Sequence, residues 1–250
     1  MRRYGRFGAF RWLLGAIVTT VGIHCTSAQV FFGEDINTNA PPGQNQVPRG
    51  PRTNADAAFA AFIASASSFD PPFYGVEDFE SFTPFTSSNF TLHVSFPATS
   101  ISGTLLCSGD NGIYAVAPNT TSSGAYPSSG EKGLMLFIAT MTLTFSAPVL
   151  GIGFYGTDAE GHLPVVRLTY EDSTTQDFVV NATGNRSGNI FFWGYKATSS
   201  SRITQMTLHW SGGRSDGLMV DDFTVLVPEP ASLVALVASL AGFIRLRRRH

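Results

Sequence analysis

Short runs of apolar or alternating residues, separated by turn residues, follow one another from residue 76 to residue 225. Such runs, rich in Phe, Val, Ile and Thr and bounded by Gly, Asn and Ser, are typical of strands, and no helical pattern lies between them. The sequence therefore predicts an all-β fold, an antiparallel β-sandwich of the jelly-roll type. The predicted strands are 76–82, 90–96, 103–107, 113–117, 134–139, 141–145, 149–156, 165–170, 175–180, 190–195, 203–210 and 218–225.

One short helix is expected before the strands. Thr53-Asn54-Ala55-Asp56 resembles a capping box with Asp in the place of Glu, and Ala55, Phe59, Phe62, Ile63 and Ala66 recur at helical spacing. Asp70-Pro71-Pro72 should end this helix. Residues 29–75 are thus predicted to be an N-terminal extension with one helix, and residues 76–227 the β-sandwich domain.

The N-terminus has the features of a secretory signal. Arg2, Arg3, Arg6 and Arg11 form a positive region, residues 12–23 are apolar, and Thr26-Ser27-Ala28 offers small residues for cleavage. We expect residues 1–28 to be a signal peptide that forms a signal helix, and the rest of the chain to be exported.

The C-terminus combines three features in a fixed order. Pro228-Glu229-Pro230 precedes an uninterrupted apolar run at 231–244, and the basic segment 245–249 follows it. As a helix this run spans ~21 Å, which is short against a bilayer core of about 30 Å. We predict a transmembrane helix that tethers the protein, with its arginines on the cytoplasmic side.

Residues 228–250 resemble the PEP-CTERM sorting tail of Gram-negative bacteria, and Pro228, Glu229 and Pro230 match its sorting motif. The segments 151–158 and 221–223 also resemble parts of β domains in such proteins. The resemblance implies cleavage by exosortase, a transient stage in the inner membrane, and delivery to the cell surface or the extracellular polysaccharide matrix. It implies no particular activity.

The charge between the two ends is strongly acidic. Residues 29–230 contain 8 Lys and Arg against 18 Asp and Glu, a net charge of −10, because the other basic residues belong to the ends. This argues against nucleic-acid binding, which needs a clustered basic surface. Cys107 is the only cysteine outside the predicted signal peptide, so the sequence predicts no disulfide within the chain.

Carboxylates gather on the first and last predicted strands of the sandwich. Glu77 and Glu80 lie on the first strand, and Asp221 and Asp222 on the last. These two strands are commonly neighbours in a jelly roll, and Ca²⁺ takes six to eight oxygen ligands. Asp221-Asp222-Phe223 also resembles the closing strand of secreted jelly-roll modules that hold a structural calcium. A structural Ca²⁺ is one interpretation; carboxylates that face solvent, or catalytic acids, are the alternatives.

Two motif matches fail on their context. Residues 151–156 match the dinucleotide fingerprint G-x-G-x-x-G, but a turn and another strand follow where a helix is required. Their glycines are expected to make room for aromatic rings across the sheet. Residues 213–217 match G-x-S-x-G, yet a strand follows Ser215 in the place of the helix that this motif needs. No catalytic residue is therefore predicted.

Aromatic residues give the remaining indication of function. Phe191 and Trp193 should occupy one face of their strand and Phe192 the other, and core packing is favoured for Trp193 and Trp210 over a sugar platform. We predict an exported, non-enzymatic surface or matrix protein that binds glycans through its sandwich, with exopolysaccharide as a partner. The alternative is a secreted carbohydrate-active hydrolase that uses paired carboxylates from among Asp158, Glu160 and Asp222.

Overall fold

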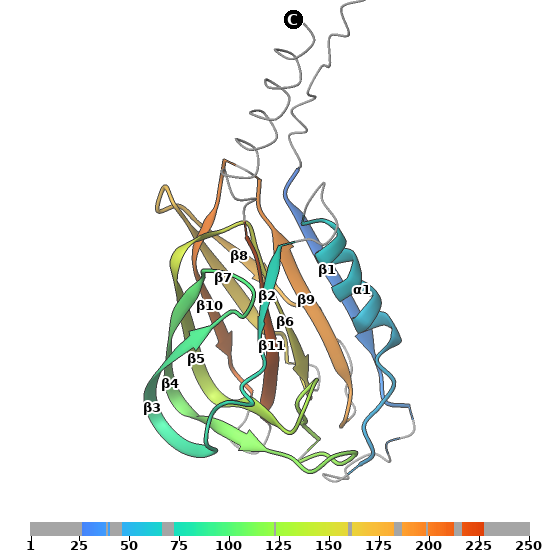
Figure 1. Ribbon diagram of the computed structural model, residues 1–250. Helices are drawn as coiled ribbons and strands as arrows, with labels where there is room; N and C mark the ends of the chain where they lie inside the picture. Colours follow the sequence, from blue (N-terminus) through green and yellow to red (C-terminus); the bar gives the residue numbers. More distant parts are fainter. Residues whose placement is uncertain are drawn as a thin grey trace, which may run out of the picture.

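The structure is a computed structural model, and its strands belong to one antiparallel sheet. It describes residues 27–38, 40, 47–66, 73–122, 124–159, 162–182, 187–198, 200–212 and 217–227. The strand order is β1-β9-β6-β11-β5-β10-β7-β8; β2 also pairs with β11, β3 with β4, and β4 with β5. The sheet curls around an apolar core, with one short helix on its outside among the described residues (Figure 1).

The strands have the following bounds: β1 Gln29–Asp35, β2 Tyr74–Glu77, β3 Phe85–Ser95, β4 Ser102–Ala115, β5 Lys132–Val149, β6 Gly151–Thr157, β7 Val165–Tyr170, β8 Thr175–Val179, β9 Ile190–Lys196, β10 Ile203–Trp210 and β11 Leu218–Leu226. The long strand β5 pairs with β4 along one edge. Its other edge pairs with β10 over most of its length and with β11 near its start. Because β5 is shared in this way, it joins the two flanks of the curled sheet.

The prediction of a mostly β, antiparallel fold is confirmed, and the strands β7 and β10 have the predicted bounds. Two predicted pairs of strands are in fact single strands. The chain continues without a turn through 108–112 in β4 and through residue 140 in β5. Asp110-Asn111-Gly112 has the composition of a turn, but it lies at an irregularity inside β4, where the pairing register shifts.

The predicted boundary at residue 76 is corrected by β1. This strand pairs with β9 along its whole length, from Gln29 opposite Lys196 to Asp35 opposite Ile190. Residues 29–75 are therefore no separate extension, since they supply an edge strand of the same sheet. Little in the amino-acid pattern indicated β1, because a strand of seven residues at an edge of the sheet needs little apolar alternation.

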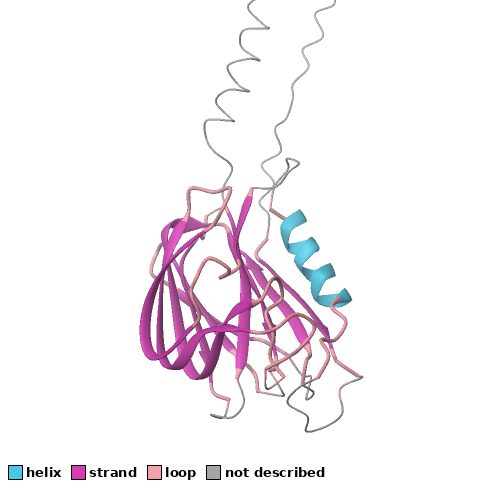
Figure 2. Cartoon of the chain, turned by 60° about the horizontal axis from the view of Figure 1, so that its bottom comes forward, coloured by secondary structure: helices cyan, strands magenta, loops and turns pink. Residues whose placement is uncertain are grey.

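The helix α1, Thr53–Ala64, is shorter than its apolar spacing suggests and lies against β1 and β9 (Figure 2). Its N-cap is Arg52, with no capping hydrogen bond from its own side chain. The carboxylate of Asp35 accepts the free N–H groups of Asn54 and Ala55 at 2.7 and 2.9 Å. The predicted capping box is therefore wrong; an acid on β1 satisfies the helix terminus in its place.

Both faces of the central strands β6 and β9 are covered. Phe191 and Trp193 belong to the inner core, whereas Phe192 packs outside the sheet with Phe62 of α1. A Cβ atom at Gly153 would lie 2.6 Å from the Phe192 ring, and one at Gly156 would overlap the Phe191 ring. The alternation predicted for β9 is confirmed, and so is the role of the β6 glycines as spaces for aromatic rings.

The strands β2 and β11 lie side by side, which confirms the predicted neighbourhood of the first and last strands of the sandwich. Phe223 is opposite Glu77, and Leu226 is opposite Tyr74.

Both predicted terminal helices lie outside the described residues: the signal helix at 1–28, apart from its last two residues, and the transmembrane helix at 231–244. In the part of the chain that the structure describes, no helix has the length and apolar character that a bilayer crossing needs.

Candidate functional site

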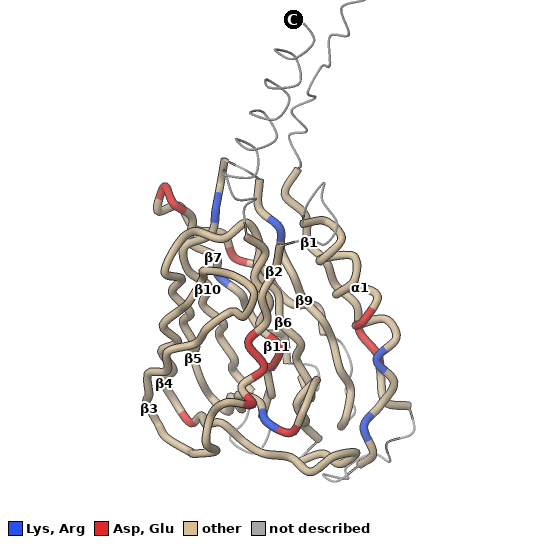
Figure 3. The backbone as a smooth tube through the Cα atoms, viewed as in Figure 1, with Lys and Arg blue, Asp and Glu red and all other residues tan. Residues whose placement is uncertain are grey.

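Asp221 and Asp222 turn toward the same loop although they are neighbours on β11. Side chains of successive strand residues normally point to opposite faces. Here the β11–β6 ladder shifts register between Asp221 and Thr224, and Asp222 adopts a positive φ of 48°. This irregularity rotates Asp222 so that both carboxylates meet the segment Ser128–Ser129. Figure 3 shows the acidic residues on β11 in the middle of the molecule.

Two serines hold this pair of aspartates. The Ser128 hydroxyl donates to Asp222 at 2.6 Å, and its oxygen lies 3.1 Å from the Asp221 carboxylate. Ser129 donates its backbone N–H to Asp221 at 3.0 Å and its hydroxyl to Asp222 at 2.7 Å. The two carboxylates therefore fix the loop before β5 onto the sheet.

Asp221 is 1% exposed as a residue, and the Oδ1 atom of its carboxylate has no hydrogen-bond partner. Burial, and then the nearby Asp222, raise the pKa of Asp221 well above the ordinary value. The pKa of Asp222 is raised as well, again chiefly by burial. A buried pair of like charges favours the uptake of a proton or a cation, because either one removes the repulsion.

The two glutamates predicted with this pair have different roles. Glu80 accepts the N–H groups of Glu131 and Lys132, both at 2.7 Å, so it holds the same loop from the other end. Glu77 accepts the N–H of Phe79 at 2.9 Å and that of Ser95 at 3.1 Å, which ties β2 to β3. The structure thus brings Glu80, Asp221 and Asp222 to one loop. Glu77 does not contact this loop in the described hydrogen bonds and binds β3 instead.

Among the described residues, no group of three or more His, Cys, Asp or Glu side chains is arranged to hold a metal ion. Asp221 and Asp222 converge with two serine hydroxyls, which are oxygen ligands that Ca²⁺ accepts. A structural calcium at these residues stays a prediction.

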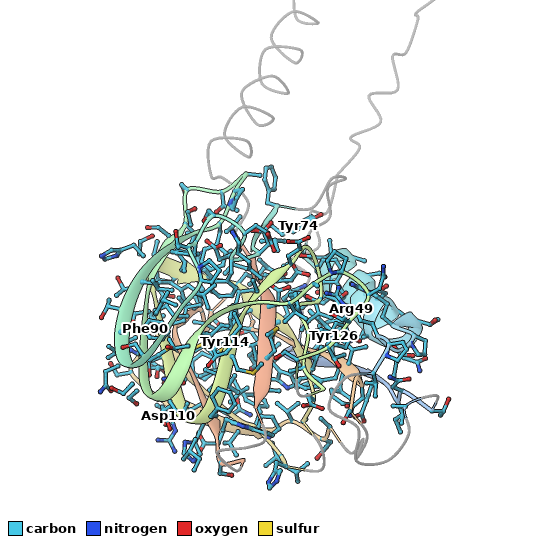
Figure 4. The ribbon with its side chains drawn as sticks, turned by 90° about the horizontal axis from the view of Figure 1, so that it is seen from below. Arg49, Tyr74, Phe90, Asp110, Tyr114 and Tyr126 are labelled. Carbon is cyan, nitrogen blue, oxygen red and sulfur yellow. The ribbon has the colours of Figure 1, made fainter. Side chains whose placement is uncertain are left out.

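A surface pocket of about 460 Å³ lies over β3, β4 and the start of β5, and its lining contains neither Asp221 nor Asp222. Figure 4 shows Tyr114, Asp110 and Phe90 on this part of the molecule. The residues that line the pocket are Thr86, Ser87, Ser88, Asp110, Asn111, Tyr114 and Phe137. Hydroxyl, amide and carboxylate groups thus surround two aromatic rings.

The pocket forms where two neighbouring strand ladders are interrupted together. The β3–β4 register shifts between Ser87 and Asn89, and the β4–β5 register shifts between Gly109 and Asn111. Gly109 has a φ of +98°, which a residue with a side chain rarely adopts. Because Asp110 lies within both irregularities, the strands splay there and the side chains are re-aimed toward the pocket.

Tyr114 and Phe137 form the aromatic part of the pocket. Their rings meet edge to face with centroids 6.0 Å apart, and both side chains are half-buried. A neighbouring pair, Phe85 and Phe90, packs edge to face at 4.8 Å. Partly exposed rings held by other rings offer an apolar surface at little cost in conformational entropy.

Asn111 supplies a polar group that the fold leaves unsatisfied. Its Nδ2 donates to the Gly109 carbonyl at 2.8 Å, while its Oδ1 has no partner. The residue is 3% exposed and lines the pocket. Because this Oδ1 atom is itself shielded from solvent, a ligand hydroxyl or amine would have to displace part of the pocket wall to donate to it, and doing so would remove the cost of the unsatisfied acceptor.

The sequence did not identify this pocket. Trp193 and Trp210, the aromatic residues first considered for sugar stacking, are 2% and 0% exposed and confirm the core packing that was favoured. Tyr114 and Phe137 fall on two predicted strands, but nothing in the sequence brought them together. Their contact depends on the register shift between β4 and β5 at Asp110.

The hydrolase alternative required two carboxylates in one cleft. The described lining of the pocket contains one, Asp110. Asp158 is buried at the end of β6 against Gly124, and Asp222 is held by the serine loop. Glu160 and Ser215 lie outside the described residues.

Comparison with known proteins gives similar structures but no family. No protein-family model matches the chain, and no curated protein matches it. A cyclase from Fischerella sp. has a TM-score of 0.37 at 9% identity, with 63% of this chain and 99% of that chain covered. TmCBM61 in complex with β-1,4-galactotriose has a TM-score of 0.30 at 15% identity, with 50% and 88% covered. The catalytic domain of a GH87 α-1,3-glucanase has a TM-score of 0.33 at 12% identity, with 64% and 29% covered.

These comparisons correct the prediction that the protein is not an enzyme. That prediction took a strand-rich sandwich without a catalytic motif as evidence for a non-enzymatic protein. Cyclases and a glucanase catalytic domain stand among the similar structures together with carbohydrate-binding modules. The exclusion of enzymes is therefore wrong, and because these TM-scores lie below 0.5 the likeness carries no activity or ligand to this chain.

Proposed function

We propose that this chain is an exported glycan-binding protein of the cell surface or extracellular matrix, and that it binds sugar in the pocket beside Tyr114. The observation that carries the proposal is the combination of two half-buried rings with the unsatisfied Oδ1 of Asn111. The C–H faces of a sugar ring are apolar and pack on aromatic rings, while its hydroxyls need hydrogen-bond partners at the rim.

The remaining lining fits the same ligand. Thr86, Ser87 and Ser88 bring hydroxyl groups from β3, and Asp110 brings a carboxylate from β4. A volume of about 460 Å³ lies within the range of small-molecule sites and accommodates a short stretch of a polysaccharide. A protein exported toward an extracellular polysaccharide matrix is surrounded by such a polymer, which is therefore available as its ligand.

Binding to a panel of oligosaccharides tests this proposal. The purified mature protein should bind at least one glycan, and Tyr114→Ala should weaken that binding at least about tenfold while the melting temperature stays close to that of the wild type. Phe90→Ala is a matched control, because Phe90 is also a partly buried ring on this part of the sheet but does not line the pocket. Loss of binding in Phe90→Ala alone would place the site elsewhere.

The sorting part of the proposal rests on the two ends of the chain. We propose that residues 1–28 direct export, that exosortase recognises Pro228-Glu229-Pro230, and that the apolar tail holds the protein in the inner membrane until it is cleaved. Replacement of the three motif residues by alanine should leave export intact and block removal of the tail. Mass spectrometry of the exported protein decides this; a tail trimmed as in the wild type would contradict the sorting role.

A further inference from the structure

We infer that the glycan site is longer than the pocket and takes several linked units of a linear polysaccharide; this inference rests on the proposed glycan-binding function. The site continues from the pocket along the outer face of the neighbouring strands β4 and β5 (Figure 1), over Ile138 and then Leu106. A single sugar or the end of a chain would fill the pocket and leave this extension unused.

A β-bulge beside the pocket turns two successive side chains of β5 outward. Leu136 and Ala139 both belong to the inner core, and they pair with β4 on either side of Asp110. Regular alternation places one outward residue between two inward ones, but here there are two. Phe137 therefore lines the pocket, and Ile138 stands next to it with 49% of its surface exposed.

The apolar surface continues beyond Ile138. Leu106 lies on the same outer face, because its neighbours Leu105 and Cys107 point into the inner core, and it is 52% exposed. It is opposite Thr142, which is four residues further along β5 than Ile138. At about 3.3 Å per residue, Ile138 and Leu106 lie roughly 13 Å apart along the strands, and several linked sugars are needed to cover that distance.

Hydroxyl groups flank these aliphatic side chains. Thr140 follows Ile138 on the outer face of β5, and Ser108 is opposite Thr140 on β4. A linear glycan has the matching pattern, with apolar C–H faces and hydroxyl groups along its edges. Residues 104–109 and 138–146 contain no charged residue, so a ligand can cover these segments without desolvating a charge that they carry.

The length of the bound chain tests this extension. In calorimetric titrations the wild type should bind a hexasaccharide of the best-bound glycan at least about tenfold more tightly than the matching disaccharide. Leu106→Ser and Ile138→Ser should each lower the affinity for the hexasaccharide about fivefold and leave that for the disaccharide within about twofold. The disaccharide thus reports whether the pocket itself is intact in each variant.

Two kinds of control accompany these variants. Leu106→Met and Ile138→Val keep an apolar side chain and should bind both chain lengths within about twofold of the wild type. Val179→Ser removes an aliphatic side chain that is also 52% exposed, but from β8, at the end of the strand order. It should change neither affinity.

The outcomes separate the extension from the pocket. Equal affinity for the two chain lengths, or a gain with length that persists in the double variant Leu106→Ser and Ile138→Ser, would overturn the inference and leave glycan binding in the pocket intact. A wild-type dimer in sedimentation that Leu106→Ser dissociates would assign this face to a second copy of the chain and overturn it as well. Failure of every sugar in the panel to bind would overturn the proposed function and the inference together.

Discussion

The ring of Tyr114 on β4 meets the ring of Phe137 on β5 edge to face, with their centroids 6.0 Å apart. The two residues are 23 positions apart in the sequence, and their strands are neighbours in the sheet. The β4–β5 register shift between Gly109 and Asn111 places Phe137 within the interrupted part of the ladder. A backbone irregularity thus builds the aromatic part of the pocket.

The buried aspartate pair predicts an unusual dependence of stability on pH. Burial raises the pKa of Asp221 in the folded state, so the folded protein binds a proton more tightly than the unfolded chain does. Asp221 therefore contributes most to the free energy of unfolding below the ordinary Asp pKa, and this contribution is lost as the pH rises through the raised pKa of the folded state. In chelator, thermal melts should therefore show that this group lowers stability between pH 4 and pH 8.

Asp221→Asn isolates this effect, because the amide keeps an acceptor for Ser128 and Ser129 and removes the charge. The variant should melt about 2–4 °C higher than the wild type at pH 8 and show a flatter pH profile. Asp177→Asn is the control: Arg167 lowers the pKa of this exposed carboxylate, so its charge stabilises the fold above the ordinary Asp pKa, and the variant should melt no higher than the wild type at pH 8. A wild-type profile unchanged by Asp221→Asn would contradict the assignment.

Calcium, if it binds at Asp221 and Asp222, should stabilise the fold without any other change. A ligand present at a hundredfold its Kd adds about 2.7 kcal/mol to the free energy of unfolding. The melting temperature should then rise between chelator and millimolar Ca²⁺, and the rise should vanish in the double variant Glu80→Ala and Asp222→Ala. No rise in the wild type, or a rise that persists in the double variant, would show that calcium does not bind there.

The glycines of β6 predict a packing defect of defined size. Gly156→Ala should lower the free energy of unfolding by about 1–3 kcal/mol, because the new methyl group overlaps the Phe191 ring in the core. Gly133→Ala on β5 is the matched control: its Cβ would lie 2.9 Å from the flexible Met219 side chain, which can move aside. Urea unfolding should show a larger decrease in the free energy of unfolding for Gly156→Ala than for Gly133→Ala. An equal decrease in the two variants would contradict the role of the β6 glycines as spaces for aromatic rings.

The elements that depend on local pattern could be predicted from the sequence. β7 alternates over its whole length and β10 alternates from Gln205 onward, and Phe191, Phe192 and Trp193 occupy the predicted faces of β9. The glycines at 153 and 156 were also interpreted correctly, because a G-x-G-x-x-G segment without a following helix has few other uses in a sheet.

The features that depend on long-range geometry could not be predicted. Asp35 caps α1 from another element, and the segment at Asp110 is an irregularity in a strand although it has the composition of a turn. The convergence of Asp221 and Asp222 needs the positive φ of Asp222, and an Asp-Asp pair in a sequence does not indicate such a backbone conformation. Both candidate sites lie at register shifts of the sheet. A prediction based on regular alternation of apolar and polar residues does not detect such shifts.

Titration of the mature protein with the best-bound oligosaccharide decides whether the pocket at Tyr114 binds a glycan. We predict saturable binding that falls at least about tenfold in Tyr114→Ala and in Phe137→Ala. Asn111→Asp, which keeps the shape but adds charge, should weaken binding as well, while Phe90→Ala should bind like the wild type. Unchanged affinity in folded Tyr114→Ala and Phe137→Ala would contradict the assignment of this pocket.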